Sequence, residues 1–316
     1  MADGVTTLAG MVTLNDQNAL HLGITNLLDD SPVLQALNAV PSSNGTNHKY
    51  ERITVAEGAG FRAVGAGRTL TDMDVELVTD TLQILDASFV ADLALADGLA
   101  AGRDAYLQGR LVHALRAAFF AVEKQIFQGT GADAAGFSGF INMSTLDALA
   151  DTMVYNGGGT TASEQTSVYL IRSGDADCSV VAGNDGNITF NDDPAVIEKV
   201  VNPGTDNKTY PALYTAVTGY MGLQVASTYS VGRVANVHAS DSNASLDDDM
   251  IFEALALFPA GKDPNMIAMN RQALKMLRAS RTATNATGAP APRPTEVEGI
   301  PIVVTDGILS TEAVET

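Results

Sequence analysis

The chain has one cysteine, few basic residues and no long hydrophobic run. Its single thiol, Cys178, excludes an internal disulfide and a cysteine-based metal cluster. No apolar stretch approaches the length of a membrane-spanning helix, and the first ten residues have no basic segment ahead of an apolar one. We therefore expect neither a signal peptide nor a transmembrane helix, and no association with a membrane.

Basic residues are outnumbered by acidic ones. Lys and Arg number 18 against 37 Asp and Glu, which gives a formal net charge of −19. This charge favours solubility and disfavours generic binding to the phosphate backbone of nucleic acid, which requires Lys and Arg. If the protein lies near DNA, we expect it to enclose the DNA rather than to grip it.

What the chain does have is enough apolar sequence for a sizeable core. Of its 316 residues, 46% are hydrophobic and 17% are charged, a balance that argues against disorder. A chain of this length can form one large domain or two smaller ones. We find no internal repeat.

The longest predicted element is a helix over residues 103–129. Gly129 stands where a C-cap belongs, and a helix of about 25 residues would be about 37 Å long. Phe120 and Phe127 fall on the otherwise polar side, together with Glu123, so we expect this helix to pack on two faces and to lean on neighbouring molecules. The apolar residues that recur at steps of three and four and form its main stripe are Leu107, Leu111, Leu115, Ala118, Phe119, Val122 and Ile126.

Two segments before this helix have little core of their own. Residues 1–48 form a predicted arm, with short helices expected from Asn18 and after Ser31. Residues 49–86 predict an extended β-hairpin with a glycine-rich tip, because apolar and polar residues alternate in both of its halves. Opposite charges on the two halves can pair across the hairpin or match a neighbouring copy. The residues that carry these charges include Arg52, Arg62, Arg68, Asp72, Asp74 and Glu76.

The second half of the chain begins with a mostly β pattern. Short apolar runs separated by turn residues extend over residues 166–237. A helix is predicted from the Asp247 cap to Phe258, a strand over 265–269 and a further helix over 271–281. We expect one basic face of this last helix to meet an acidic partner surface, such as another copy of the chain, rather than DNA. The basic residues on that face are Arg271, Lys275 and Arg278.

Residues that usually carry catalysis or hold metals form no recognisable arrangement. Cys178, in a valine-rich run, indicates a small buried side chain rather than a nucleophile. The glycines of the hairpin tip lack the spacing of a phosphate-binding loop, and the acids near residues 175, 185 and 192 do not fit a calcium loop. We predict no enzyme activity, no catalytic or metal-binding residue and no cofactor. The histidines, none of which has a partner at metal-ligand spacing, are His21, His48, His113 and His238.

An ordered set of segments carries a family resemblance. The set comprises the arm, the hairpin with Gly60-Phe61-Arg62, a lead-in at residues 85–97, the long helix and its glycine-rich exit, then residues 269–278 and 298–306. In this order the chain resembles the major capsid proteins of tailed bacteriophages, which share the Hong Kong ninety-seven fold. The resemblance covers most of the chain, and its specificity lies in the ordered set rather than in any single motif.

The resemblance implies an α+β shell subunit built from four parts. These are an N-terminal arm at 1–48, an extended hairpin at 49–86, a peripheral domain at 87–240 and an axial domain at 241–316. The peripheral domain would contain a spine helix at 103–129 and the β-rich segment. The hairpin would lie over one neighbour and the arm would brace another.

Two departures from the family pattern bear on these expectations. The β-rich segment at 166–237 precedes the helix, strand and helix of 247–281, whereas many relatives place comparable strands after them. We infer a permuted connectivity from this order. Some relatives join subunits through Lys–Asn bonds, but the hairpin here has only Lys49, at its base, so we do not predict that chemistry.

The resemblance further implies a structural protein that assembles with itself. Hexamers and pentamers would form an icosahedral shell of a virion, made in the host cytoplasm and enclosing double-stranded DNA without sequence-specific binding. Decoration, scaffold and portal proteins are further expected partners. Two alternatives remain open: the shell of an encapsulin-like nanocompartment that holds enzyme cargo, and a cytosolic hydrolase that uses Cys178 or a histidine.

Overall fold

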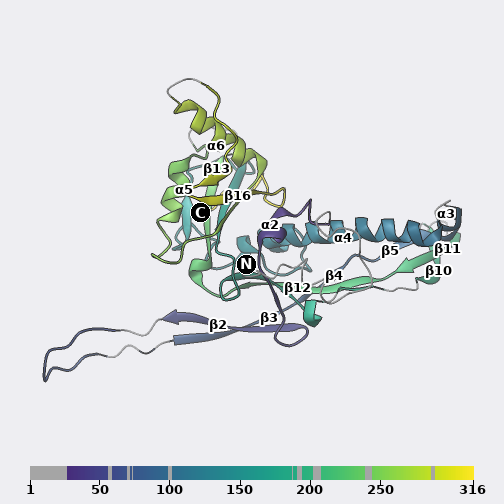
Figure 1. Ribbon diagram of the computed structural model, residues 1–316, viewed down its shortest axis with the longest axis horizontal. Helices are drawn as coiled ribbons and strands as arrows, with labels where there is room; N and C mark the ends of the chain where they lie inside the picture. Colours follow the sequence, from purple (N-terminus) through teal and green to yellow (C-terminus); the bar gives the residue numbers. More distant parts are fainter. Residues whose placement is uncertain are drawn as a thin grey trace, which may run out of the picture.

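The computed structural model shows an elongated molecule with one lobe, a long helix that extends to one side, and a hairpin that extends below the lobe to the other side (Figure 1). No helix among the described residues is long and apolar enough to cross a membrane. The residues that the structure describes are 27–55, 59–69, 72, 74–98, 102–186, 188–190, 194–201, 208–238, 244–285 and 289–316.

The long helix α4 spans Arg103–Gln128 and confirms the predicted spine helix almost residue for residue. Its buried face includes Leu115, Phe119, Val122 and Ile126, as the apolar stripe predicts. The helix ends at Gly129, whose φ is 51°. A Cβ at this position would overlap the side chain of Asn142 and lie 2.6 Å from the Gly139 nitrogen, so only glycine fits the exit of the helix.

Two small sheets lie beside α4 (Figure 1). The first has the order β1-β8-β12-β4, with β9 also paired to β12, and the second has the order β10-β11-β5. One residue separates β11 from β12, so these strands continue from one sheet into the other, and α3 (Leu93–Gly98) connects β5 to the start of α4. The strand bounds are β1 Ala39–Pro41, β4 Gln83–Asp86, β5 Phe89–Asp92, β8 Cys178–Ala182, β9 Thr189–Phe190, β10 Ala195–Val201, β11 Lys208–Thr215 and β12 Val217–Val225.

The lobe is built on a six-stranded mixed sheet with the order β15-β16-β14-β7-β13-β6. Strands β7, β13 and β14 are buried along their whole length, so both of their faces are covered and they show no alternation of buried and exposed residues. Helices α5 (Asp248–Leu255) and α6 (Arg271–Ala283) belong to this lobe. The strand bounds are β6 Val154–Asn156, β7 Gln165–Ile171, β13 Val231–His238, β14 Met266–Met269, β15 Glu296–Val297 and β16 Ile300–Val304.

This sheet contradicts the domain boundary predicted at residue 240. Strands β6, β7 and β13 come from the segment 87–240, whereas β14, β15 and β16 come from 241–316. Strand β7 pairs with β13 on one side and with β14 on the other. The two predicted segments therefore share one sheet, because neighbours in a sheet need not be neighbours in sequence.

The hairpin consists of β2 (Asn47–Val55) paired antiparallel with β3 (Asp74–Thr81). The predicted hairpin at 49–86 extends too far at its C-terminal end, because β3 ends at Thr81. Strand β4 leaves it and pairs with β12 in the five-stranded sheet. The projecting part is therefore β2, β3 and the segment between them, and residues 83–86 belong to the body of the molecule.

The described part of the predicted arm belongs partly to the core of its own chain. Helix α2 spans Pro32–Ala36 and confirms the helix expected after Ser31. Val33, Leu34 and Leu37 are fully buried, and β1 pairs in parallel with β8. Residues 27–41 are therefore integrated into the body of their own molecule. The helix predicted from Asn18 lies mainly outside the described residues.

Other predicted elements differ in their ends or their existence. Asp147 to Met153, a predicted short helix, is a series of turns. Helix α5 begins after the predicted Asp247 cap, whose carboxylate accepts a hydrogen bond from Met250 N at 2.8 Å, but it ends at Leu255 rather than at Phe258. Helix α6 is capped by Asn270, which accepts from Ala273 N in the same way.

Candidate subunit interfaces

The hairpin exposes apolar side chains to solvent. Phe61 and Val64, between β2 and β3, are fully exposed, and Leu77 on β3 is 63% exposed. At its base the hairpin is fixed to the body, because His48 Nε2 lies 2.6 Å from Gln224 Oε1 and Arg52 Nη2 donates to the Val225 carbonyl at 3.2 Å. The base of the hairpin is held by the body and its tip exposes apolar side chains, a combination that is typical of a surface that binds another molecule.

The charged residues predicted on the hairpin fall in different surroundings. Arg52 faces Glu76 in the β2–β3 register, yet its guanidinium turns to the body at Val225. Arg62 and Arg68 are exposed in the segment between the strands. Asp72, Asp74 and Glu76 are exposed as well. The register thus places one predicted pair of opposite charges, Arg52 and Glu76, across from each other.

The two phenylalanines predicted on the second face of α4 have different roles. Phe120 is half-buried, and the Lys124 ammonium lies 4.6 Å from the centre of its ring. Phe127 is 2% exposed and packs against the rings of Phe140 and Tyr169, at centroid distances of 5.7 and 5.3 Å. The prediction of Phe127 as an interface residue is therefore wrong, because the lobe of its own chain covers the C-terminal end of α4 on this side.

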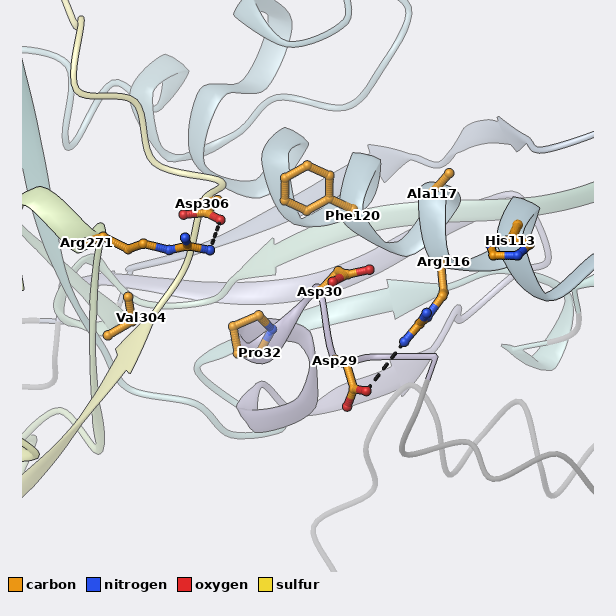
Figure 2. Close-up of a pocket in the computed structure, with 10 residues that line it drawn as sticks. All are labelled: Asp29, Asp30, Pro32, His113, Arg116, Ala117, Phe120, Arg271, Val304 and Asp306. Atoms are coloured by element: carbon orange, nitrogen blue, oxygen red, sulfur yellow. Dashed lines mark hydrogen bonds and ion pairs between the residues drawn. The ribbon is translucent and has the colours of Figure 1, made fainter.

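Phe120 lines a hollow of about 520 Å³ between α4, the turn before α2 and the end of β16 (Figure 2). Two ion pairs frame it: Arg116 with Asp29 at 3.4 Å, and Arg271 with Asp306 at 2.5 Å. The hollow therefore brings together Phe120 and Arg271, two residues that the sequence predicted as interface residues in separate segments. The other residues around it are Asp30, Pro32, His113, Ala117 and Val304.

The basic face predicted on α6 is present. Arg271, Lys275 and Arg278 are all exposed along one side of the helix. Arg281 leaves this face, because its guanidinium donates two hydrogen bonds to the Asp248 carboxylate at 2.8 and 2.6 Å. That ion pair joins the last turns of α6 to the first turn of α5.

Glu123 joins three segments, and sequence reasoning missed it. The side chain is fully buried, although the sequence pattern placed it on the polar side of the helix. Its Oε2 accepts from Val33 N at 2.9 Å and Leu34 N at 3.1 Å, and its Oε1 accepts from the Thr305 hydroxyl. Burial raises the pKa of this carboxyl to about 7, against the opposing effect of the hydrogen bonds. The contact connects α2, α4 and the residue after β16.

A second buried charge fixes the C-terminal residues, and no pattern in the sequence indicated it either. Arg233 on β13 is 1% exposed. Its guanidinium lies 3.3 Å from Glu312 and 2.8 Å from Glu315, and it donates to the Leu146 carbonyl at 2.9 Å and to Ser167 Oγ at 3.0 Å. A buried arginine is tolerated when carboxylates and carbonyls satisfy it in this way.

The side chains considered for catalysis lie apart. Cys178 is fully buried, and burial raises the pKa of its thiol far above the usual range, which disfavours the reactive thiolate. His48 contacts Gln224, His113 lines the hollow and His238 lies 3.3 Å from Glu164. His21 lies outside the described residues. Within the described ranges, no group of His, Cys, Asp and Glu is arranged to hold a metal ion.

The acids considered for calcium have protein partners. Asp175 accepts from Asn38 Nδ2 at 2.5 Å, and Asp177 lies 3.2 Å from Arg172 Nε. Asp185 sits in a turn with a φ of 56°. The acids at 192 and 193 lie outside the described residues. Asp175 and Asp177 thus fix loops of the body.

Comparison with solved structures defines the class of protein. The chain is similar to one from the structure of bacteriophage Epsilon15, with 20% identity, coverage of 88% of this chain and 87% of that chain, and a TM-score of 0.57. It is also similar to the bacteriophage JBD30 capsid, with 13% identity, coverage of 91% and 94%, and a TM-score of 0.52. The fold is that of phage shell subunits, the Hong Kong ninety-seven type.

A family model then identifies the chain. Residues 16–315 match the family described as "Major capsid protein GP7", and the chain belongs to that family. It is a structural subunit that forms a capsid shell. No curated protein sequence matches it.

Proposed function

We propose that this subunit forms hexamers and pentamers that close into an icosahedral shell around the double-stranded DNA genome of a tailed bacteriophage. The observation that carries the proposal is the hairpin, with a tip that exposes Phe61 and Val64 completely. Such side chains gain about 1.5–3 kcal/mol each when they are buried, so their position favours a partner. In a shell, another copy supplies that partner.

The parts of the fold suit different places in the shell. We assign the lobe with the six-stranded sheet to the axial domain, near the centre of each ring. The spine helix with the two smaller sheets would be the peripheral domain. The hairpin would lie over one neighbour and the N-terminal arm would brace another. These assignments follow the family and use the observed sheets in place of the boundary at residue 240.

We further propose that contacts between copies use the charged and apolar residues predicted from the sequence, without Phe127. Phe120 and Arg271 would contribute through the hollow of Figure 2. The charged residues of the hairpin are exposed apart from Arg52, so they are accessible to a neighbouring copy along the length of the hairpin. The proposed contact residues are Arg52, Arg62, Arg68, Asp72, Asp74, Glu76, Phe120, Arg271, Lys275 and Arg278.

The net charge of the chain is consistent with a shell that encloses DNA without binding it tightly. At −19, the subunit repels the DNA backbone on average, so the shell would hold the genome by closure rather than by specific contacts. Scaffold, portal and decoration proteins would be further partners, and assembly would take place in the host cytoplasm. We propose no enzymatic role, because the buried thiol of Cys178 and the three described histidines form no catalytic arrangement among the residues that the structure describes.

The test is electron microscopy of the purified protein, alone and with candidate scaffold proteins. We expect closed shells or rings, and DNA in particles from infected cells. Enzyme cargo instead of DNA would favour the nanocompartment alternative. A compact monomer at high concentration under all these conditions would contradict shell formation. An activity abolished by Cys178→Ala or His238→Ala would favour the hydrolase alternative.

A further inference from the structure

The outer face of α5 is acidic and apolar, and none of the residues that the structure describes covers it. Ile251 and Ala254 point into the lobe and are fully buried. Asp249, Phe252 and Glu253 lie on the other side, at helical spacings of three and four residues, and all are exposed. Phe252 is 57% exposed, which is unusual for an aromatic side chain on a short helix of a packed lobe.

The outer face of α6 is basic with a small residue in it. Ala273, Met276 and Leu277 form the buried side of this helix. Lys275, Arg278 and Ala279 are exposed, and Lys275 lies four residues before Ala279 and three before Arg278. The two helices therefore present faces of opposite charge. The face of α5 carries the exposed ring of Phe252, and the face of α6 carries the small side chain of Ala279.

Within the described part of the chain, the charges on these faces are not paired with opposite charges. Among the described residues, no ion pair involves Asp249, Glu253 or Lys275, and Arg278 donates its Nε to the Ala291 carbonyl rather than to a carboxylate. The neighbouring Asp248 does have a partner, Arg281 on α6, and this pair ties the two helices together. The unpaired charges are thus those that point away from the lobe.

We propose that the α5 face of one copy packs against the α6 face of the next copy around a ring. Phe252 would lie over Ala279 and the aliphatic stem of Lys275. Asp249 and Glu253 would pair with Lys275 and Arg278. In this arrangement each copy offers its α5 face to one neighbour and its α6 face to the other, so the contact is head to tail and can close into a ring, which is the arrangement that a capsomer requires. This inference rests on the self-assembly proposed above.

A second copy fits these faces better than DNA does. The basic face of α6 has only three cations, Arg271, Lys275 and Arg278, and the Arg271 guanidinium already lies 2.5 Å from the Asp306 carboxylate. The chain as a whole is strongly acidic, and phosphate binding needs several unpaired cations on one surface. The acidic face of α5 provides the complementary charge, together with an apolar anchor that DNA binding would not use.

Charge reversal tests the contact. One variant carries Lys275→Glu with Arg278→Glu, the second carries Asp249→Lys with Glu253→Lys, and the third carries all four substitutions. We expect each two-residue variant to need at least about tenfold more protein to assemble, or to form no particles, because like charges then face each other. The four-residue variant should assemble again. Light scattering and electron microscopy measure the outcome.

Mixing gives a sharper readout. Equal amounts of the two two-residue variants should form rings in which they alternate, so six-membered rings should form and five-membered rings should not. The control is Lys262→Glu with Arg293→Glu, two exposed basic residues of the lobe with the same change in charge. It should assemble like the wild type.

The outcomes separate the contact from shell formation itself. If the wild type forms shells and the Lys275→Glu, Arg278→Glu variant forms them equally well, the contact is wrong while the proposed function stands. Failure of the four-residue variant to assemble, with a thermal unfolding midpoint like that of the wild type, would also overturn it. A control that blocks assembly would assign the effect to net charge alone and likewise overturn the contact. If the wild type forms neither shells nor rings, the proposed function itself fails.

Discussion

Glu123 makes the stability of the subunit depend on pH in a definite direction. Its folded pKa of about 7 lies above the ordinary value of 4.5, so the folded state holds the proton more tightly than the unfolded state does. The resulting stability is fully present below the unfolded pKa and is lost as the pH rises through the folded one. The buried contact with α2 is therefore more stable in mild acid.

We predict that Glu123→Gln removes this dependence. The amide is neutral throughout, and its oxygen can accept from Val33 N and Leu34 N as the carboxylate does. Between pH 5.5 and 8, the free energy of unfolding of the wild type should fall by about 2 kcal/mol relative to the variant. Urea unfolding of unassembled subunit at several pH values measures the difference. Parallel curves for the two proteins would contradict the raised pKa.

Gly129 provides a second test at the scale of one residue. Its positive φ and its closeness to Asn142 and Gly139 leave no room for a methyl group, so Gly129→Ala must displace the turn that follows α4. We expect a loss of at least about 2 kcal/mol in the free energy of unfolding. Gly131→Ala, in the same turn but with open space around it, is the matched control and should cost less than about 1 kcal/mol.

At the scale of elements, the hairpin separates the stability of the subunit from that of the shell. Phe61→Ser with Val64→Ser should change the unfolding free energy of the free subunit by less than about 0.5 kcal/mol, since both side chains are already in solvent. The same variant should form fewer particles, counted by electron microscopy. Ala63→Ser with Ala66→Ser changes exposed tip residues of small volume and serves as the control.

Proteolysis of the wild type gives an independent readout of the same element. Trypsin should cut the free subunit after Arg62 and Arg68, both exposed, and should cut them much more slowly in shells. Equal protection in a lone folded subunit would show that the hairpin needs no neighbour. That result would remove the main support for its role in assembly.

The sequence predicted elements well where local periodicity decides the structure. The spine helix and its end at Gly129 follow from a regular apolar stripe and one glycine. The buried strands β7 and β14 also follow from short apolar runs. By contrast, Asp147 to Met153 has a helical pattern but forms turns, because such a short segment takes its conformation from the packing around it.

The candidate interface was predictable only in part. Charge pattern located the basic face of α6, since exposed charges mark surfaces by themselves. Phe127 was misplaced and Glu123 was overlooked for the same reason: the helical wheel shows which residues share a face but not that the lobe covers the polar face near the end of α4. Burial of these two residues depends on Phe140, Tyr169 and Thr305, which are distant in sequence.

At the scale of the whole molecule, the order of strands in space was the missing information. The predicted boundary at residue 240 assumed that consecutive segments form separate bodies. The six-stranded sheet instead takes β7 and β13 from before that boundary and β14 and β16 from after it. Such pairings carry no local signature, because their specificity lies in which apolar faces fit together after the chain has folded. Whether the connectivity is permuted within the family stays a prediction.

The anchoring of the last residues by Arg233 has a practical consequence for engineering. A truncation that removes Glu312 and Glu315 would strand a cation in the interior of the lobe, at a cost of about 3–5 kcal/mol. Peptides for display would therefore be better inserted in the exposed stretch near Pro292 and Arg293 than exchanged for the tail. The C-terminal residues therefore contribute to the stability of their own lobe through their contacts with Arg233.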